Sequence, residues 1–114
     1  MRELLKSKIH HAIVTHTDLY YEWSLFIDSY LLEQANILPN EKVEVTNINN
    51  WLRWSTYAVP MEKNSWIVSV NWWWARLSAI GDKLIIMAFE YTDKENIDAS
   101  IITLNDDNTI KSSK

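Results

Sequence analysis

The chain has 114 residues, with no cysteine, two prolines and a single glycine. Without cysteine it forms neither disulfides nor thiolate metal sites, so nothing indicates an oxidising compartment. No apolar run approaches the ~20 residues that a membrane-spanning helix needs, and residues 1–8 are too charged for a signal peptide. Positive charge is also scarce, since the net charge is −4, which argues against general nucleic-acid binding. We therefore expect one domain over residues 1–114, cytoplasmic, with neither a membrane nor a nucleic acid as partner.

The glycine deficit is matched by an excess of tryptophan. Average usage of about 7% predicts about eight glycines in a chain of this length. The sequence has Gly81 alone, together with seven tryptophans, and these two counts add up to eight. Hydrophobic residues make up 47% of the chain, which favours a packed core over disorder.

The hydrophobic pattern predicts strands more than helices. Apolar and β-branched residues, alternating or in short runs, predict strands at residues 8–14, 42–48, 67–70, 83–89 and 99–104. A helix is expected at 29–36, with Asp28 or Ser29 as its N-cap and Asn36 as a left-handed C-cap, and one helical turn at 74–79. Residues 105–108 predict a turn before a flexible polar tail at 109–114. Many short strands with one or two helical turns favour a small β-barrel.

Spacing alone identifies no reaction. The three histidines lack the carboxylate or cysteine spacing of a metal site, and Ser24 does not lie in a G-x-S-x-G elbow. Lys8 and Arg53 are of residue types that are most often simply exposed, and Tyr57 could be a core tyrosine with its hydroxyl bonded. Taken one at a time, these residues leave a structural role open for each.

Four short motifs, taken together, are more specific. They read Y-E-W-S at 21–24, N-N-W-L-R-W-S-T-Y at 49–57, N-W-W-W-A at 71–75 and G-D-K-L-I-I at 81–86. In order and separation they resemble the words Y-x-G-S, N-N-G-x-R-x-x-T-Y, N-G-A-A-A and G-D-x-x-I-I of the aspartate 1-decarboxylase family. Residues 8–10 and 37–43 fit as well, so the resemblance runs from about residue 5 to residue 108.

The resemblance implies both a fold and an activity. The family fold is a six-stranded double-psi β-barrel, assembled as a homotetramer with active sites between neighbouring subunits. The implied reaction is decarboxylation of L-aspartate to β-alanine and CO₂ for pantothenate biosynthesis. Its cofactor would be a pyruvoyl group made from the chain itself, with no metal. The amine of aspartate would condense with this group as a Schiff base, and the group would serve as the electron sink.

The motifs also imply which residues make the cofactor and move protons. The proenzyme would cut itself between Trp23 and Ser24, and Ser24 would become the pyruvoyl group. Thr56 would hydrogen-bond the carbonyl before the scissile bond and later contact the substrate. Tyr57 would donate a proton to the decarboxylated carbon.

Substrate binding is implied for a second set of residues. Arg53 and Lys8 would hold the two carboxylates of aspartate, and a guanidinium can do so with two parallel hydrogen bonds. His10 and Asn71 would complete the hydrogen bonding of the pocket. Three further positions would line the site through their backbone N–H groups: Trp72, Trp73 and Trp74.

The tryptophans are where the chain departs from the family pattern. Trp23, Trp51 and Trp72 stand where the family words have glycine, and Trp66 lies at a loop-to-strand junction where glycine is also expected. At three other positions the family has residues other than tryptophan: Trp54, Trp73 and Trp74. Because such turns often need a positive φ, which tryptophan resists, we interpret the seven tryptophans as glycine codons (UGA) read with the wrong genetic code.

Other interpretations of the tryptophans stay open. An engineered or degenerate copy would carry them genuinely, and would then be an unprocessed, inactive homologue or a scaffold on the same barrel. A binding module could use them as stacking platforms for sugars or single-stranded nucleic acid. That module would not explain the ordered motifs. We expect protein with literal tryptophans to be unprocessed at Ser24 and inactive.

Overall fold

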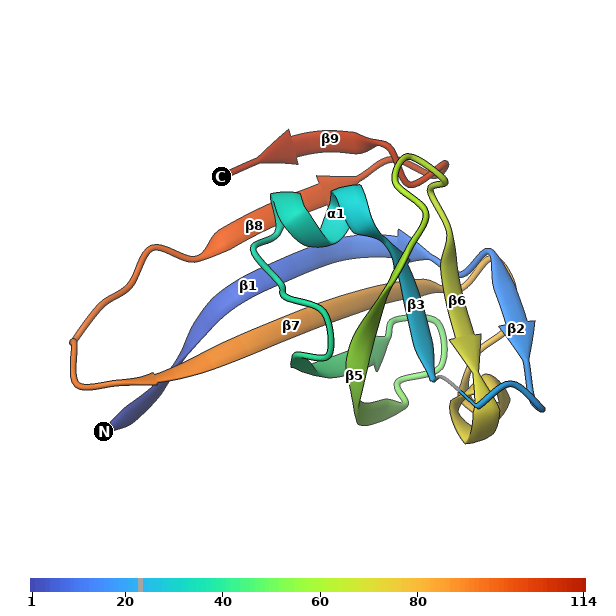
Figure 1. The fold of residues 1–114 in the computed structure, drawn as a ribbon, viewed down its shortest axis with the longest axis horizontal. Helices are drawn as coiled ribbons and strands as arrows, with labels where there is room; N and C mark the ends of the chain where they lie inside the picture. Colours follow the sequence, from blue (N-terminus) through green and yellow to red (C-terminus); the bar gives the residue numbers. More distant parts are fainter. Residues whose placement is uncertain (23) are drawn as a thin grey trace.

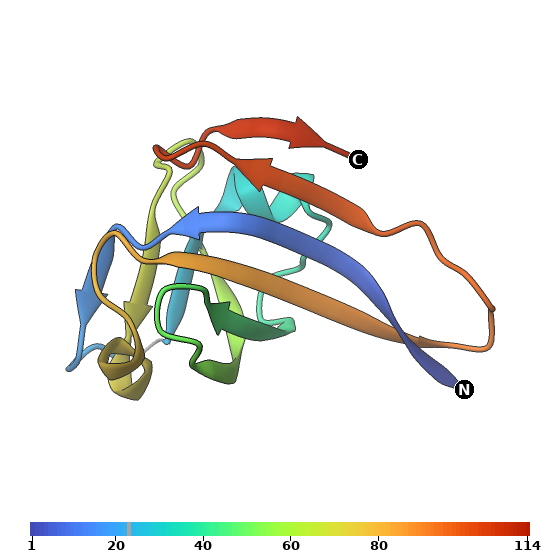
Figure 2. The ribbon, with the colours of Figure 1, turned by 180° about the vertical axis from the view of Figure 1, so that it is seen from behind.

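A computed structural model describes residues 1–22 and 24–114, and the structure is mainly β, as the sequence predicts (Figures 1 and 2). Along the described chain the elements are β1 (Arg2–Ile13), β2 (His16–Asp18), β3 (Leu25–Asp28), α1 (Ser29–Gln34), β4 (Lys42–Asn47), β5 (Arg53–Met61), β6 (Val68–Asn71), the 3₁₀-helix η1 (Trp72–Leu77), β7 (Lys83–Thr92), β8 (Ser100–Leu104) and β9 (Ile110–Ser113). In this part of the chain no helix has the length and apolarity needed to cross a membrane.

The strands form one mixed sheet in the order β2-β6-β3-β5-β4-β7-β1-β8-β9. Three neighbouring pairs are parallel, namely β2–β6, β3–β5 and β1–β8, and the others are antiparallel. Figure 1 shows β1, β7 and β8 running along the long axis, with β3, β5 and β6 crossing them steeply. Among the described residues the sheet has nine strands rather than six, in part because the short β2 and β9 extend it at its two ends.

Strand β5 joins the two directions of the sheet. Its first half, residues 53–57, pairs antiparallel with β4, and its second half, residues 58–61, pairs parallel with β3. The strand therefore turns from one layer into the other between Tyr57 and Ala58. This corner carries residues of the N-N-x-x-R-x-x-T-Y motif to the start of β3.

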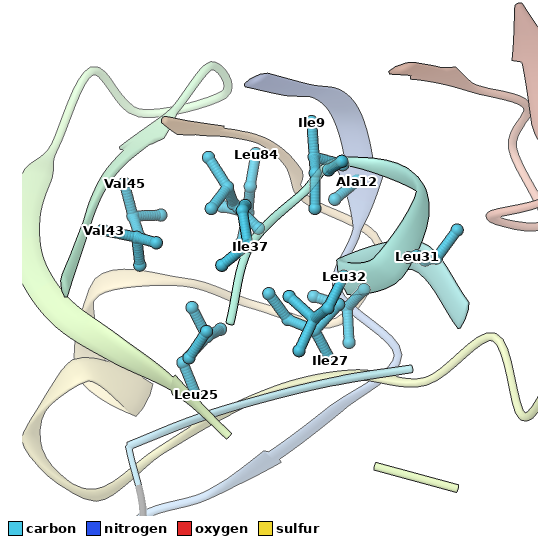
Figure 3. Close-up of a cluster of buried hydrophobic side chains, with 14 of the residues drawn as sticks. Ile9, Ala12, Leu25, Ile27, Leu31, Leu32, Ile37, Val43, Val45 and Leu84 are labelled. Carbon is cyan, nitrogen blue, oxygen red and sulfur yellow. The ribbon is translucent and has the colours of Figure 1, made fainter. Parts of the chain in front are cut away.

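The hydrophobic core lies between these layers and under α1. Ile9 and Ala12 of β1, Leu25 and Ile27 of β3 and Leu84 of β7 are fully buried. Figure 3 shows these side chains converging with others from the helix, the following loop and β4: Leu31, Leu32, Ile37, Val43 and Val45. Along β1, β4 and the first half of β7, inward residues alternate with more exposed ones, which is the pattern of a sheet with one buried face.

The predicted helix is confirmed, although it ends at Gln34 rather than at residue 36 and its C-cap is Ala35 rather than Asn36. Asp28 is the N-cap, and its carboxylate accepts a hydrogen bond from the Tyr30 N–H at 2.8 Å. The same carboxylate, which is fully buried, also accepts from the backbone N–H groups of Asn64 and Trp66, at 3.0 and 2.8 Å. Just beyond the helix, Asn36 has a φ of 57°, in the left-handed region. One buried carboxylate thus fastens the helix start to the loop between β5 and β6.

Two other expectations differ from the structure. Residues 109–114 are not a loose tail, because Ile110–Ser113 form β9 and pair antiparallel with β8 after a turn at 105–108. Ile110 packs against the core, which provides a physical reason for the strand. The helical turn starts two residues earlier than expected, as the 3₁₀-helix η1. Gly81 follows it with a φ of 96°.

Candidate active site

A cluster of buried hydroxyl and amide groups lies where β3, β5 and β6 meet. Ser24 is 1% exposed, and its hydroxyl is hydrogen-bonded to the hydroxyl of Thr56. The carbonyl oxygen of Ser24 accepts a hydrogen bond from the Asn71 backbone N–H at 2.7 Å. The Ser69 hydroxyl in turn donates to the side-chain oxygen of Asn71 at 2.8 Å. The structure therefore brings together three of the sequence-derived candidates, Ser24, Thr56 and Asn71.

Strand register explains this convergence. In the sheet β3 lies between β5 and β6, and its first residue, Leu25, is opposite both Ala58 of β5 and Val70 of β6. Ser24, one residue earlier, is therefore carried to the end of β6 and to the corner of β5. Thr56 points inward there because the buried side chains of β5 alternate with exposed ones.

Ser69 is a member of the cluster that the motifs do not identify. It is 6% exposed and lies two residues before Asn71 on β6. Since side chains two apart on a strand share a face, the period of the strand could have suggested it. The motifs do not indicate which side chain bonds Asn71, so the sequence gives no reason to prefer Ser69 to any other buried serine.

The basic candidates lie on the outer face of the sheet and not in the buried cluster. Lys8 and His10 alternate with the buried Ser7 and Ile9 on β1, so they point away from the core. Arg53 is exposed at the start of β5. Cross-strand register places His10, Ile85, Thr46 and Arg53 in one row over β1, β7, β4 and β5. Three strand spacings of ~4.8 Å put the ends of this row about 14 Å apart.

Arg53 also lines a groove on this outer face. The groove has a volume of about 610 Å³, and its lining includes Lys42, Glu44, Arg53, Met87, Phe89 and Tyr91. Within the described residues neither Lys8 nor Arg53 has a carboxylate within ion-pair distance. Both cations are therefore available to an acidic ligand. Tyr57 is half-buried and follows Thr56 on β5, so strand alternation directs it to the face opposite Thr56.

The histidine that the motifs indicate has an unusual neighbour. The rings of His10 and His11 lie with their centroids 3.9 Å apart and their planes at 35°. Burial, the adjacent His11 and then Lys8 lower the pKa of His10 below its usual value of 6.5. Its Nδ1 is buried and has no hydrogen-bond partner among the described residues.

The tryptophans at 72–74 follow the buried cluster directly, because η1 begins right after Asn71. Trp72 and Trp73 are 43% and 67% exposed, with ring centroids 5.1 Å apart. Trp74 stacks on the buried Trp54 at 6.5 Å and 12°. The Nε1 of Trp54 is buried and has no hydrogen-bond partner in the described part of the chain.

Backbone angles single out three of the tryptophans. Trp51, Trp66 and Trp72 have φ values of 68°, 56° and 58°, in the left-handed region that favours glycine. These are three of the four positions where glycine is expected from the motifs. The fourth, Trp23, lies outside the described residues, and so does the expected contact of Thr56 with the Trp23 carbonyl.

Side chains that could bind a metal ion are not clustered in the described residues. No group of three or more histidine, cysteine, aspartate or glutamate side chains lies together there in a way that could hold an ion.

These features define a class of protein: a small β-sheet domain with a buried serine hydroxyl, bonded to a threonine hydroxyl, at the entry to a strand. Comparison with known proteins makes the class specific. The model of the family described as aspartate decarboxylase matches residues 1–111. An aspartate 1-decarboxylase from Paraburkholderia phymatum is 46% identical over 117 residues, which cover 99% of this chain and 91% of that protein. One from Burkholderia pseudomallei is 45% identical with the same coverage. The chain belongs to the aspartate decarboxylase family, and the resemblance seen in the motifs is confirmed.

Proposed function

We propose that this chain is the proenzyme of a pyruvoyl-dependent aspartate 1-decarboxylase, a cytoplasmic enzyme that converts L-aspartate to β-alanine and CO₂ for pantothenate biosynthesis. The observation that carries the proposal is the buried hydrogen bond between the hydroxyls of Ser24 and Thr56. Ser24 is the last residue of the Y-E-W-S motif, at the point where the family pattern predicts self-cleavage. Membership of the family supports the overall reaction, and the buried hydroxyl pair supports Ser24 as the residue that is converted.

Self-cleavage would begin at the Ser24 hydroxyl. Its oxygen attacks the carbonyl carbon of residue 23, an ester forms, and the amide bond between residues 23 and 24 breaks to free the amine of Ser24. Elimination across the Ser24 Cα–Cβ bond then releases residue 23 as a carboxylate. Water hydrolyses the resulting dehydroalanine to a pyruvoyl group with loss of ammonia. Thr56, whose hydroxyl is bonded to that of Ser24, would orient the attacking oxygen and accept or return its proton.

The surroundings of Ser24 fit the group that would form there. The Asn71 backbone N–H bonds the Ser24 carbonyl, and Ser69 fixes the side chain of Asn71. The pyruvoyl group supplies an electron-accepting carbonyl for decarboxylation. Its surroundings are nearly closed to solvent, since Ser24, Thr56, Ser69 and Asn71 are all at most 8% exposed. A low-dielectric site of this kind strengthens the hydrogen bonds that hold the reacting atoms.

Substrate binding would use the outer face of a second subunit. Lys8, Arg53 and Tyr57 point away from the Ser24 cluster of their own chain, so the cluster and the cations do not form one pocket within a subunit. An assembly in which the outer face of one copy covers the Ser24 cluster of its neighbour would join them. We therefore propose a homotetramer with active sites between subunits. The cations would then hold the two carboxylates of aspartate, and Tyr57 would return the proton to carbon.

We also propose that the natural residues at positions 51, 66 and 72 are glycines, and that the seven tryptophans are UGA codons read as tryptophan. The positive φ values at these three positions support the proposal, because an L-residue in this region is strained by roughly 1–2 kcal/mol. At position 54 the buried indole nitrogen without a partner also disfavours tryptophan. Sequencing the gene tests this directly: UGA at all seven codons supports it, and UGG at any of them contradicts it.

The test of function compares two proteins, one with the literal sequence and one with glycine at all seven tryptophan positions. We expect intact-mass spectrometry to find the literal protein as one chain, without activity. The glycine-restored protein should appear as two fragments divided before Ser24 and should release β-alanine and CO₂ from L-aspartate. Ser24→Ala in the glycine-restored protein is the control and should abolish both cleavage and activity. A restored protein that is intact and inactive would refute the proposal.

A further inference from the structure

A bulge in β1 places an additional histidine beside Lys8 and His10. The pairing of β1 with β7 shifts by one residue between His10 and Ala12, and the extra residue, His11, has a φ of 69°. In a regular strand neighbouring side chains point to opposite faces. Here the bulge brings both rings to the same side, as their centroid separation of 3.9 Å requires. Bulges of this kind re-aim side chains and are common beside active sites.

The residues paired directly with Lys8 and His10 carry no charge, and Glu44 of β4 follows one strand beyond Met87 in the Lys8 row. On β7, Met87 and Ile85 stand opposite Lys8 and His10, and on β8 the opposite residues are Ile101 and Thr103. Directly paired side chains share a face of the sheet, so these four are the nearest cross-strand neighbours. None of them can neutralise a cation. Lys8 also forms no ion pair within the described part of the chain.

Three basic side chains with no acid paired directly opposite Lys8 or His10 form a site that an anion would complete. Burial, then the neighbouring His11 ring and then Lys8 oppose protonation of His10 and lower its pKa. The Nδ1 of His10 is buried and unpartnered among the described residues, so one nitrogen already lacks a hydrogen bond. A carboxylate placed against the group would relieve the repulsion and accept hydrogen bonds from it.

We propose that His11 is a further substrate-binding residue, and that it forms with Lys8 and His10 a receptor for one carboxylate group of a dicarboxylate. This inference rests on the proposed function, since it names the substrate-facing surface of the same site. It assigns the second carboxylate to an Arg53. Within one chain the backbone of Arg53 lies about 14 Å from that of His10 along the row of the sheet. The Arg53 of another copy is the alternative. His11 lies outside the motif-derived set, which includes only Lys8 and His10 from this strand.

The test uses succinate, a dicarboxylate that lacks the amine and so binds without reacting. We would record the ring-proton NMR signals of the three histidines in the full chain during a succinate titration. The signals of His10 and His11 should move with one shared dissociation constant, while His16, exposed and bonded to Thr15, should stay in place. Movement of all three signals alike, or of none, would overturn the proposal.

Substitutions at position 11 distinguish the effect of the imidazole ring from the effect of the backbone bulge. His11→Asn removes the ring and keeps a residue that tolerates the left-handed conformation, so the fold should survive. We expect it to weaken succinate binding about tenfold, since one of three charge-assisted contacts is lost. His11→Arg restores a cation and should recover most of the binding, and His16→Asn is the matched control that should bind as the unmodified chain does. Equal binding by His11→Asn and His16→Asn would refute the role of His11.

The activity assay distinguishes this inference from the proposed function. In glycine-restored, processed protein, His11→Asn should raise the KM for L-aspartate about tenfold while kcat changes little. An unchanged KM with active enzyme would refute the inference and leave the proposed function intact. Weaker succinate binding by His11→Asn in a protein that makes no β-alanine would support the carboxylate receptor and refute the proposed function.

Discussion

Replacing Trp51 by glycine should stabilise the protein, although it removes the largest side chain from the surface. Trp51 has a φ of 68°, and its backbone N–H donates to the Asn47 carbonyl at 2.9 Å, so the turn that holds it is fixed. The indole is 88% exposed and therefore contributes little buried area. Because the side chain contributes little and the backbone is strained, the balance should favour glycine.

The size of the effect follows from two opposing contributions. An L-residue in the left-handed region costs roughly 1–2 kcal/mol. Glycine loses more conformational entropy on folding, which offsets roughly 0.5–1 kcal/mol of that gain. We expect Trp51→Gly to raise the free energy of unfolding by about 1 kcal/mol, which corresponds to a Tm increase of about 4 °C in a domain of this size.

Urea denaturation with a matched substitution is the appropriate assay. Trp73 is also exposed, at 67%, but has no positive φ and lies within η1. Trp73→Gly should therefore lower stability by roughly 0.5–1 kcal/mol, because glycine disfavours helical conformations. If Trp51→Gly destabilises the protein as much as Trp73→Gly does, the backbone argument for glycine at these turns is wrong.

Three other outcomes are expected. Asp28→Asn leaves three backbone N–H groups with a weaker acceptor or none, so the free energy of unfolding should fall by about 3 kcal/mol in urea titrations. Asp18→Asn, at an exposed position, is the control. Thr56→Val in glycine-restored protein should slow self-cleavage at least tenfold by time-resolved mass spectrometry, and Thr56→Ser should retain most of the rate. Because the folded state lowers the pKa of His10, the unfolded chain binds the proton more tightly than the folded one. In melting curves recorded against pH, Tm should therefore hold steady above about pH 6.5 and decline below it. His10→Gln should flatten that decline.

The sequence predicted the capped helix and five of the strands because their signals are local. Asp28 can only act as an N-cap if a helix follows, and Asn36 tolerates the left-handed angle that ends it. The strands β2, β3, β5 and β9 escaped prediction. β2, β3 and β9 are only three or four residues long, and β5 contains a proline and a polar residue, Thr56, at a buried position, so its apolar residues do not alternate in the sequence.

The candidate site was predictable from motifs but not from spacing. Ser24, Thr56 and Asn71 are 15 to 47 positions from one another, and only the pairing of β3 with β5 and β6 joins them. His11 gave no local signal, because a bulge arises from the mismatch between two paired strands and not from either strand alone. Long-range register is therefore what the sequence did not supply.

The corner in β5 makes this segment intolerant of changes in length. Side chains on a strand alternate between faces, so inserting or deleting one residue between Arg53 and Thr56 without shifting β4 would reverse the two faces of the strand beyond that point. Thr56 would turn outward and lose Ser24, while Tyr57 would turn into the core. A substitution in this segment, in contrast, changes one side chain and leaves the faces of the others as they are. Lineages that vary this protein should therefore place insertions in the loop between β7 and β8, at residues 93–99, and keep the length between Arg53 and Ala58 constant.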